Sequence, residues 1–170
     1  MKRVLHVVHE FQTGGAERVI LDLTLRSSPG IQNFVCSLCE PHDLVSRLDL
    51  TKTGFVCLKK QTGNDFAIAK KIARIIDQEQ IDVVHAQGWG TFVESLVAAK
   101  LYAKRRSAFI YAFHGKSMQD VAMGIPYRRR IAQRGAPDAV WACRRSLLRH
   151  PLAAFSRRRH ALSRSLTAIT

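Results

Sequence analysis

The sequence predicts a doubly wound α/β fold, in which helices cover both faces of a Rossmann-like parallel sheet. Short, valine-rich apolar segments recur along the chain, as expected of strands that are buried on both faces. Segments with helical spacing of apolar residues alternate with them, and the connections are short. A chain of 170 residues is most simply one domain, and no internal repeat or low-complexity linker precedes residue 140.

The amino-terminal half is expected to contain three strands and two helices. The first strand is predicted at 3–8, and the helix after Gly14 and Gly15 has one apolar stripe. The members of this stripe are Ala16, Val19, Ile20 and Leu23. After the breaker "SSPG", the chain is expected to form a strand at 31–38, a short helix at 42–50 and a strand at 54–59.

The second half continues the alternation. Asn64 or Asp65 is expected to cap a helix with isoleucines at helical spacing, namely Ile68, Ile72, Ile75 and Ile76. A strand follows at 81–86, and Thr91 with Glu94 predicts a capping box for the next helix. The apolar face of that helix is expected at Val93, Leu96, Val97 and Leu101. The remaining elements are expected to be a strand at 108–113, a helix at 125–134 and a strand at 138–143.

Three polar loops are expected to meet at one edge of this sheet. Ligands of doubly wound sheets bind at the carboxyl ends of the strands, where the strand order reverses. With the order 3-2-1-4-5, the loops at 9–15, 85–89 and 114–115 would converge there. His85 and His114 end strands and are candidates for hydrogen bonds to a hydroxyl or a phosphate, whereas His6 is expected to be a satisfied core residue.

Gly14 and Gly15 indicate an anion-binding turn. They allow close approach of a ligand to the backbone, and the helix after them presents free N–H groups with a partial positive charge. The alternative is that they only permit a tight turn. The turn "TGGAER" has no G-x-G-x-x-G, which argues against NAD and FAD, and "GKS" at 115–117 lacks the rest of a P-loop.

The cysteines are expected to be free thiols. Cys36 and Cys39 form a C-x-x-C, but Cys57 and Cys143 are isolated, so no second pair completes a structural zinc site. The C-x-x-C also lies in a segment that reads as a strand, whereas a redox pair should begin a helix.

Positive charge is concentrated at the carboxyl end. The net charge is +14, and residues 141–170 contain seven arginines and no acidic residue. Arginine clusters favour phosphates, but few aromatic side chains lie between them for stacking on bases, so nucleic acid is not the favoured partner. No apolar run approaches the roughly 20 residues of a membrane-spanning helix. The chain is expected in the cytoplasm. Peripheral contact with the inner face of the plasma membrane is the alternative location.

Three segments together resemble a known family. These are "HVVHEFQTGGAERVILDL", "IDVVHAQGWGTFVESLVAAKL" and "FIYAFHGKS". In order and spacing they resemble the N-terminal domain of family 4 retaining glycosyltransferases of the GT-B fold, over roughly residues 1–140. The resemblance implies one half of a two-domain enzyme that transfers a sugar from a nucleotide-sugar donor to a glycan or lipid-linked acceptor with retention of configuration, without a metal or another cofactor.

The resemblance also implies roles for individual residues. Gly14 and Gly15 would approach the donor diphosphate, and His114 of "FHG" would be the catalytic residue beside the reacting sugar. The N-terminal domain mainly binds the acceptor in this family, which makes the acceptor-binding candidates His85, Gln87, Trp89 and Gly115. Synthesis of a cell-surface polysaccharide is the expected context.

The resemblance ends before the carboxyl end. Family members continue into a second domain with two glutamates spaced eight apart, and no acidic residue follows Asp138 here. Residues 141–170 are therefore expected to be a basic tail, either a frameshift product that begins between about 134 and 144, or a genuine tail. The favoured interpretation is an acceptor-binding half with very weak donor affinity that is inactive alone. Alternatives are a stand-alone module whose tail docks on nucleic acid or anionic membrane, and pairing with a separately encoded second half.

Overall fold

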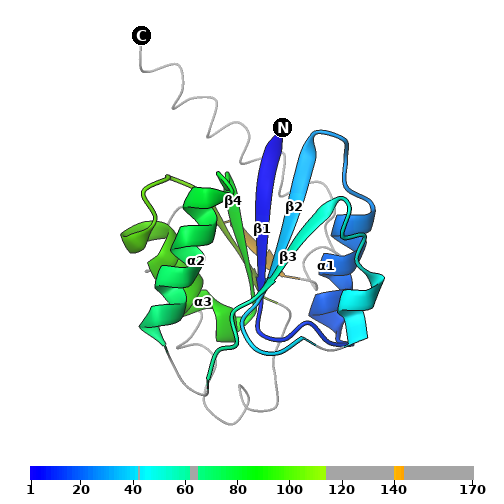
Figure 1. Ribbon diagram of the computed structural model, residues 1–170, viewed down its shortest axis with the longest axis horizontal. Coiled ribbons are helices and arrows are strands. Elements are labelled where there is room, and N and C mark those ends of the chain that lie inside the picture. Colours follow the sequence, from blue (N-terminus) through cyan, green and yellow to red (C-terminus); the bar gives the residue numbers. More distant parts are fainter. Residues whose placement is uncertain (42, 62–64, 114–139, 144–170) are drawn as a thin grey trace.

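The residues that the structure describes form a parallel sheet of six strands in the order β3-β2-β1-β4-β5-β6 (Figure 1). The computed structural model describes residues 1–41, 43–61, 65–113 and 140–143. The strands are β1 (Lys2–Val8), β2 (Ile31–Ser37), β3 (Thr53–Cys57), β4 (Val83–Gln87), β5 (Ala108–Phe113) and β6 (Val140–Cys143). The predicted order is confirmed, and the strand ends agree with the expected ranges within two residues. The expected helix at 125–134 lies outside the described residues.

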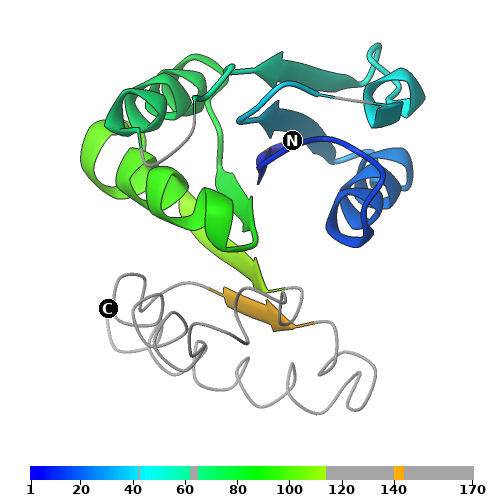
Figure 2. The same cartoon turned by 90° about the horizontal axis from the view of Figure 1, so that it is seen from below.

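Helices cover both faces of the sheet, which confirms the doubly wound α/β class. Figure 2 shows α1 and the 3₁₀ helix η1 on one face, and α2 and α3 on the other. The helical elements are α1 (Gly15–Leu25), η1 (Asp43–Arg47), α2 (Phe66–Gln78), α3 (Trp89–Val97) and the π-helical turn η2 (Ala98–Tyr102). Because side chains alternate along a strand, Leu5 and Val7 of β1 join the core under α2 and α3, whereas His6 and Val8 face α1.

The face that α1 buries differs from the predicted stripe. Val19 and Leu23 are 38% and 45% exposed, and the helix buries Ile20, Leu21 and Thr24 instead. Thr24 can be buried because its hydroxyl donates a hydrogen bond to the carbonyl of Leu21 at 2.8 Å. An apolar pattern in the sequence treats a threonine as polar. The predicted stripe of α1 is therefore shifted by about one residue from the face that the helix buries.

The cap of α2 was predicted correctly. The Asp65 carboxylate accepts a hydrogen bond from the Ala67 N–H at 2.8 Å, as an N-cap does. Ile68, Ile72 and Ile76 are buried, while Ile75 is half-buried at the edge of the same core. The alternative cap, Asn64, lies outside the described residues.

The predicted capping box of α3 is wrong. The helix begins at Trp89 with Gly88 as its N-cap, and Thr91 lies inside the first turn, where its hydroxyl donates to the Gln87 carbonyl at 2.9 Å. Gly88 has φ +70°, a conformation that favours glycine, and this turn starts the helix earlier than the box implied. Leu101, expected on the buried face, is 73% exposed, because the wider turn η2 breaks the helical spacing.

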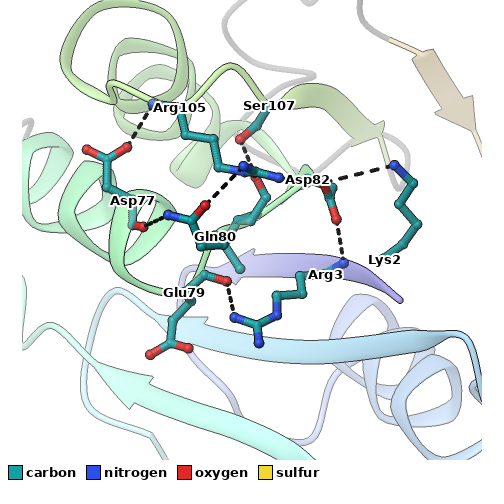
Figure 3. Close-up of polar contacts among 9 residues, drawn as sticks. Lys2, Arg3, Asp77, Glu79, Gln80, Asp82, Arg105 and Ser107 are labelled. Atoms are coloured by element: carbon teal, nitrogen blue, oxygen red, sulfur yellow. Dashed lines mark hydrogen bonds and ion pairs between the residues drawn. The ribbon is translucent and has the colours of Figure 1, made fainter.

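A polar network closes the amino ends of the strands, as Figure 3 shows. The Asp82 carboxylate accepts hydrogen bonds from the Arg3 N–H at 2.9 Å and from the Arg105 guanidinium at 2.8 Å. These bonds lower the pKa of Asp82, the Arg3 N–H contributing most. Arg105 also donates to the Ile81 carbonyl at 3.0 Å, so the segment before β5 is tied to the turn between α2 and β4. The network supports the fold at the edge opposite the candidate site.

Within the described ranges, no helix is long and apolar enough to cross a membrane.

Candidate functional site

The candidate site lies at the carboxyl edge of the sheet, where β1, β2 and β4 end at Val8, Ser37 and Gln87. The strands run away from the N label in Figure 1, so this edge is at the lower end of that view. The strand order reverses between β1 and β4, which is where ligands bind in doubly wound sheets. His114 and Gly115, two of the expected site residues, lie outside the described residues.

The turn before α1 contains Gly14 as the N-cap and Gly15 as the first helical residue. Gly14 has φ −147° and ψ 171°, an extended conformation that any residue adopts, and among the described glycines Gly88 alone has a positive φ. Backbone conformation therefore does not demand glycine at either position.

Part of the space above Gly14 is taken by Glu17. A Cβ atom added at Gly14 would lie 2.3 Å from Oε2 of Glu17, so the carboxylate lies directly over Gly14. A carboxylate in the first turn of a helix is favoured by the free N–H groups and by the helix dipole. The helix end already attracts one internal negative charge, at the position where an external anion would bind.

Asp43 anchors the loop that leads to this turn. Its carboxylate accepts hydrogen bonds from the Thr13 N–H, at 3.0 Å, and from the Thr13 hydroxyl. Asp43 belongs to η1, so the residue before Gly14 is held by a second element. Nothing in the spacing of the sequence predicted this contact.

A row of polar side chains crosses three neighbouring strands beneath the edge. His6 of β1 is paired in register with His85 of β4, and their Nδ1 atoms are 3.0 Å apart. His6 Nε2 is 3.0 Å from Oδ1 of Asn33 on β2, and Nε2 of Gln87 is 2.8 Å from Nε2 of His85. The prediction that His6 is a satisfied core residue is confirmed, since it is 3% exposed.

The protonation state of His6 determines which atoms of this row donate hydrogen bonds and which accept them. Burial lowers the pKa of His6, against a smaller opposing effect of the bond to Asn33, so the ring is neutral. Neutral His6 donates from Nε2 to Asn33 and accepts at Nδ1 from the Nδ1–H of His85. In this arrangement Nε2 of His85 accepts from the Gln87 amide, whose nitrogen also lies 3.2 Å from Nδ1 of His85.

Trp89 is separated from His85 and Gln87 although it is close to them in sequence. Its ring stacks on Phe92, with centroids 5.5 Å apart and planes at 18°, and it packs against the core on the α2 and α3 face. His85 and Gln87 lie on the opposite face, which α1 covers. The structure thus brings two of the expected acceptor-binding residues together and places the third elsewhere.

A second group of side chains at this edge was not predicted from the sequence. His9, Glu10 and Cys39 follow β1 and β2, and their possible ligand atoms lie within 4.8 Å of one another. Burial is the main factor that raises the pKa of Cys39, with a further contribution from Glu10. The predicted adjacency of the first two strands was the one signal that could have located this group. The described cysteines, Cys36, Cys39 and Cys57, are free thiols, as expected.

A buried ion pair braces the same edge. The Lys60 ammonium lies 2.6 Å from Oε1 of Glu94, and the two side chains are 5% and 4% exposed. Lys60 follows β3, where its N–H donates to the Leu38 carbonyl at 2.7 Å, and Glu94 belongs to α3. The pair therefore joins the end of one strand to the helix that follows β4.

The family model described as Glycosyltransferase Family 4 matches residues 13–166. Among solved structures, the chain is similar to a glycosyltransferase from Rickettsia africae ESF-5, with 18% identity and a TM-score of 0.54. The match covers 82% of this chain and 42% of that one, so this chain spans less than half the length of the Rickettsia protein. No curated protein gives a significant match by sequence.

Proposed function

Because the chain belongs to glycosyltransferase family 4, we propose that it is the acceptor-binding half of an enzyme that transfers a sugar from a nucleotide-sugar donor to a glycan or lipid-linked acceptor. The single observation that carries the proposal is the family match, which extends over residues 13–166. The similarity to 42% of the Rickettsia chain supports the idea that this chain corresponds to one half of such an enzyme. Synthesis of a cell-surface polysaccharide is the proposed context.

The donor diphosphate is proposed to bind at Gly14 and Gly15. The free N–H groups at the start of the 11-residue helix α1 would donate to its phosphate oxygens. Glu17 would have to swing away, so binding would exchange an internal carboxylate for an external anion. Fixed N–H dipoles of this kind stabilise a departing diphosphate without a metal. We propose, from the family resemblance, that the transfer retains the configuration of the sugar.

Roles at the acceptor follow from the resemblance and from position. We propose that His114 lies beside the reacting sugar as the catalytic residue and that Gly115 lies next to it. His85 and Gln87 are proposed to bind acceptor hydroxyls from the edge of β4. Trp89 is proposed to take part through its exposed portion, since its stacking on Phe92 leaves it half-buried.

The chain alone is proposed to be inactive and to bind the donor very weakly, because most nucleotide contacts would belong to a second domain. We propose that the domain spans about residues 1–140, and the described strand β6 (Val140–Cys143) lies at that boundary. Residues 141–170 stay a proposed basic tail, either genuine or the product of a frameshift between about 134 and 144. Translation of the DNA downstream of codon 130 in all three frames tests this point: a second domain in another frame would support the frameshift interpretation.

The donor site can be tested with the nucleoside diphosphate UDP as the probe. In ¹H–¹⁵N spectra of the chain, millimolar UDP should shift the amide signals at 14–17, and Gly14→Ala should reduce the shifts. Gly30→Ala is the matched control, because a Cβ there meets nothing within 4 Å. Shifts confined to other residues would refute the site, and micromolar binding by calorimetry would refute the proposed weakness of the isolated half.

A second candidate function is a stand-alone module whose basic tail docks on nucleic acid or anionic membrane. The seven arginines in 141–170 favour it. Removing residues 144–170 leaves β6 intact and separates the two functions. If the tail is functional, the deletion abolishes salt-sensitive binding to DNA or to anionic vesicles; if the intact chain shows no such binding, this candidate fails.

A further inference from the structure

Three side chains of different chemistry meet where β1 and β2 end. They are the imidazole of His9, the carboxylate of Glu10 and the thiol of Cys39, and their ligand atoms lie within 4.8 Å of one another. The closest pair recorded among them is Cys39 Sγ and His9 Nε2, at 3.8 Å. His9 is exposed, and the other two are half-buried, so the group is open to solvent on one side.

The backbone holds these residues in place. The Leu38 N–H donates to the Val8 carbonyl at 2.9 Å and the Cys39 N–H donates to the His9 carbonyl at 2.8 Å. These bonds continue the pairing of β1 with β2 beyond the ends of both strands. The start of α3 supports the imidazole from another side, since a Cβ at Gly90 would lie 3.4 Å from Nδ1 of His9.

We propose that His9, Glu10 and Cys39 bind a Zn²⁺ ion. Zinc takes imidazole nitrogen, carboxylate oxygen and thiolate sulfur, in tetrahedral sites with bond lengths of about 2.0–2.3 Å. Those lengths place a nitrogen and a sulfur ligand about 3.6 Å apart, close to the 3.8 Å found for His9 and Cys39. The thiolate excludes Mg²⁺ and Ca²⁺, which prefer oxygen ligands.

The charges around the group suit a divalent cation. Zinc binding displaces the proton of the Cys39 thiol to solvent, and the ion then neutralises the resulting thiolate together with the Glu10 carboxylate. Lys60 is the nearby cation, and its charge is offset by Glu94 at 2.6 Å. The neighbouring thiol of Cys57 donates to the Cys39 carbonyl at 3.2 Å and is thus directed at the backbone.

The proposed ion would lie at the carboxyl ends of β1 and β2, where it can stabilise the loop that follows β1. Three protein ligands leave a fourth position for water, and the exposed face gives an entry path. The bound ion joins the ends of two strands at the start of the loop that leads to Gly14 and Gly15. It therefore stabilises this loop.

The test uses Co²⁺ as a spectroscopic substitute for Zn²⁺ on the full chain after treatment with a chelator. One equivalent of Co²⁺ should produce a thiolate-to-metal absorption band, and one equivalent of Zn²⁺ should remove it. Cys39→Ser should abolish the band, and His9→Gln and Glu10→Gln should weaken Co²⁺ binding by at least about 10-fold to 100-fold. Cys57→Ser and Cys143→Ser are the matched controls and should leave it unchanged.

A second measurement needs no variant. Zn²⁺ should protect Cys39 from alkylation, with the site read by mass spectrometry, while Cys57 should react at the same rate with and without the ion. The proposal is overturned if the folded wild-type chain shows no band, if the band survives Cys39→Ser, or if Zn²⁺ leaves the alkylation rate of Cys39 unchanged.

Discussion

Replacing Lys60 by methionine should destabilise the chain strongly. Lys60→Met removes the cation 2.6 Å from Glu94 and leaves that carboxylate in a place where its side chain is 4% exposed. Breaking a buried pair from one side costs about 3–5 kcal/mol, because an uncompensated charge stays out of water. For a chain of this size each kcal/mol corresponds to roughly 2–4 °C, so the melting temperature should fall by about 6–20 °C.

Lys59 provides a control one residue away. It pairs with Glu40 at 3.3 Å, but the two side chains are 73% and 64% exposed, so water screens the pair. Lys59→Met should cost less than about 1 kcal/mol. The double variant Lys60→Met/Glu94→Leu should recover most of the stability, since an apolar pair of similar volume replaces two buried charges.

Urea unfolding followed by circular dichroism gives the free energy of unfolding of all four proteins. Equal costs for Lys60→Met and Lys59→Met would refute the reasoning, because the two pairs differ mainly in exposure. A double variant no more stable than Lys60→Met would also refute it, by showing that loss of packing and not an unpaired charge causes the effect.

The remaining predictions concern pH, the α1 face and the amino-edge network. Burial lowers the pKa of folded His6 below its unfolded value of about 6.5, so the unfolded chain binds more protons as the pH falls through that value. The free energy of unfolding should therefore drop between pH 7.5 and 5.5, and the drop should be smaller in His6→Gln; an equal drop would contradict this. Leu21 is 2% exposed and Leu23 is 45% exposed. In urea unfolding, Leu21→Asp should therefore lower the free energy of unfolding by several kcal/mol, and Leu23→Asp should lower it by less than about 1 kcal/mol. The reverse order would support the stripe that the sequence predicted. Arg105→Lys should speed amide hydrogen exchange near Asp82, because a lysine cannot bond the Asp82 carboxylate and the Ile81 carbonyl at the same time. Unchanged exchange would show that the network is dispensable.

The fold could be predicted from the sequence because its strongest signals are local. Valine-rich strands and the spacing of isoleucines in α2 indicate element type, and the strand order then agrees with the order that is common in doubly wound sheets. The errors arose where a polar side chain was buried through a contact that no spacing reveals. Thr24 is buried by a bond to its own helix, and Glu94 is buried by Lys60, which lies 34 residues earlier.

The site was predictable only where the sequence marks it with glycine or with a strand end. Gly14, His85 and Gln87 were expected at the carboxyl edge for this reason, and they lie at or beneath it, while their roles in binding stay predictions. The group formed by His9, Glu10 and Cys39 was missed because its members come from two strands, and their closeness depends on the register between them. Trp89 was expected beside His85, but the turn at Gly88 directs it to the other face of the sheet.

The polar row through His6 couples ionisation to the orientation of an amide two strands away. Should His6 take up a proton, both of its ring nitrogens become donors, and His85 must then accept at Nδ1 and carry its hydrogen on Nε2. Gln87 would have to turn its carbonyl oxygen, in place of its amide nitrogen, toward that hydrogen. A proton gained in the interior of the sheet would thereby reverse the polarity that Gln87 presents to His85 at the carboxyl edge.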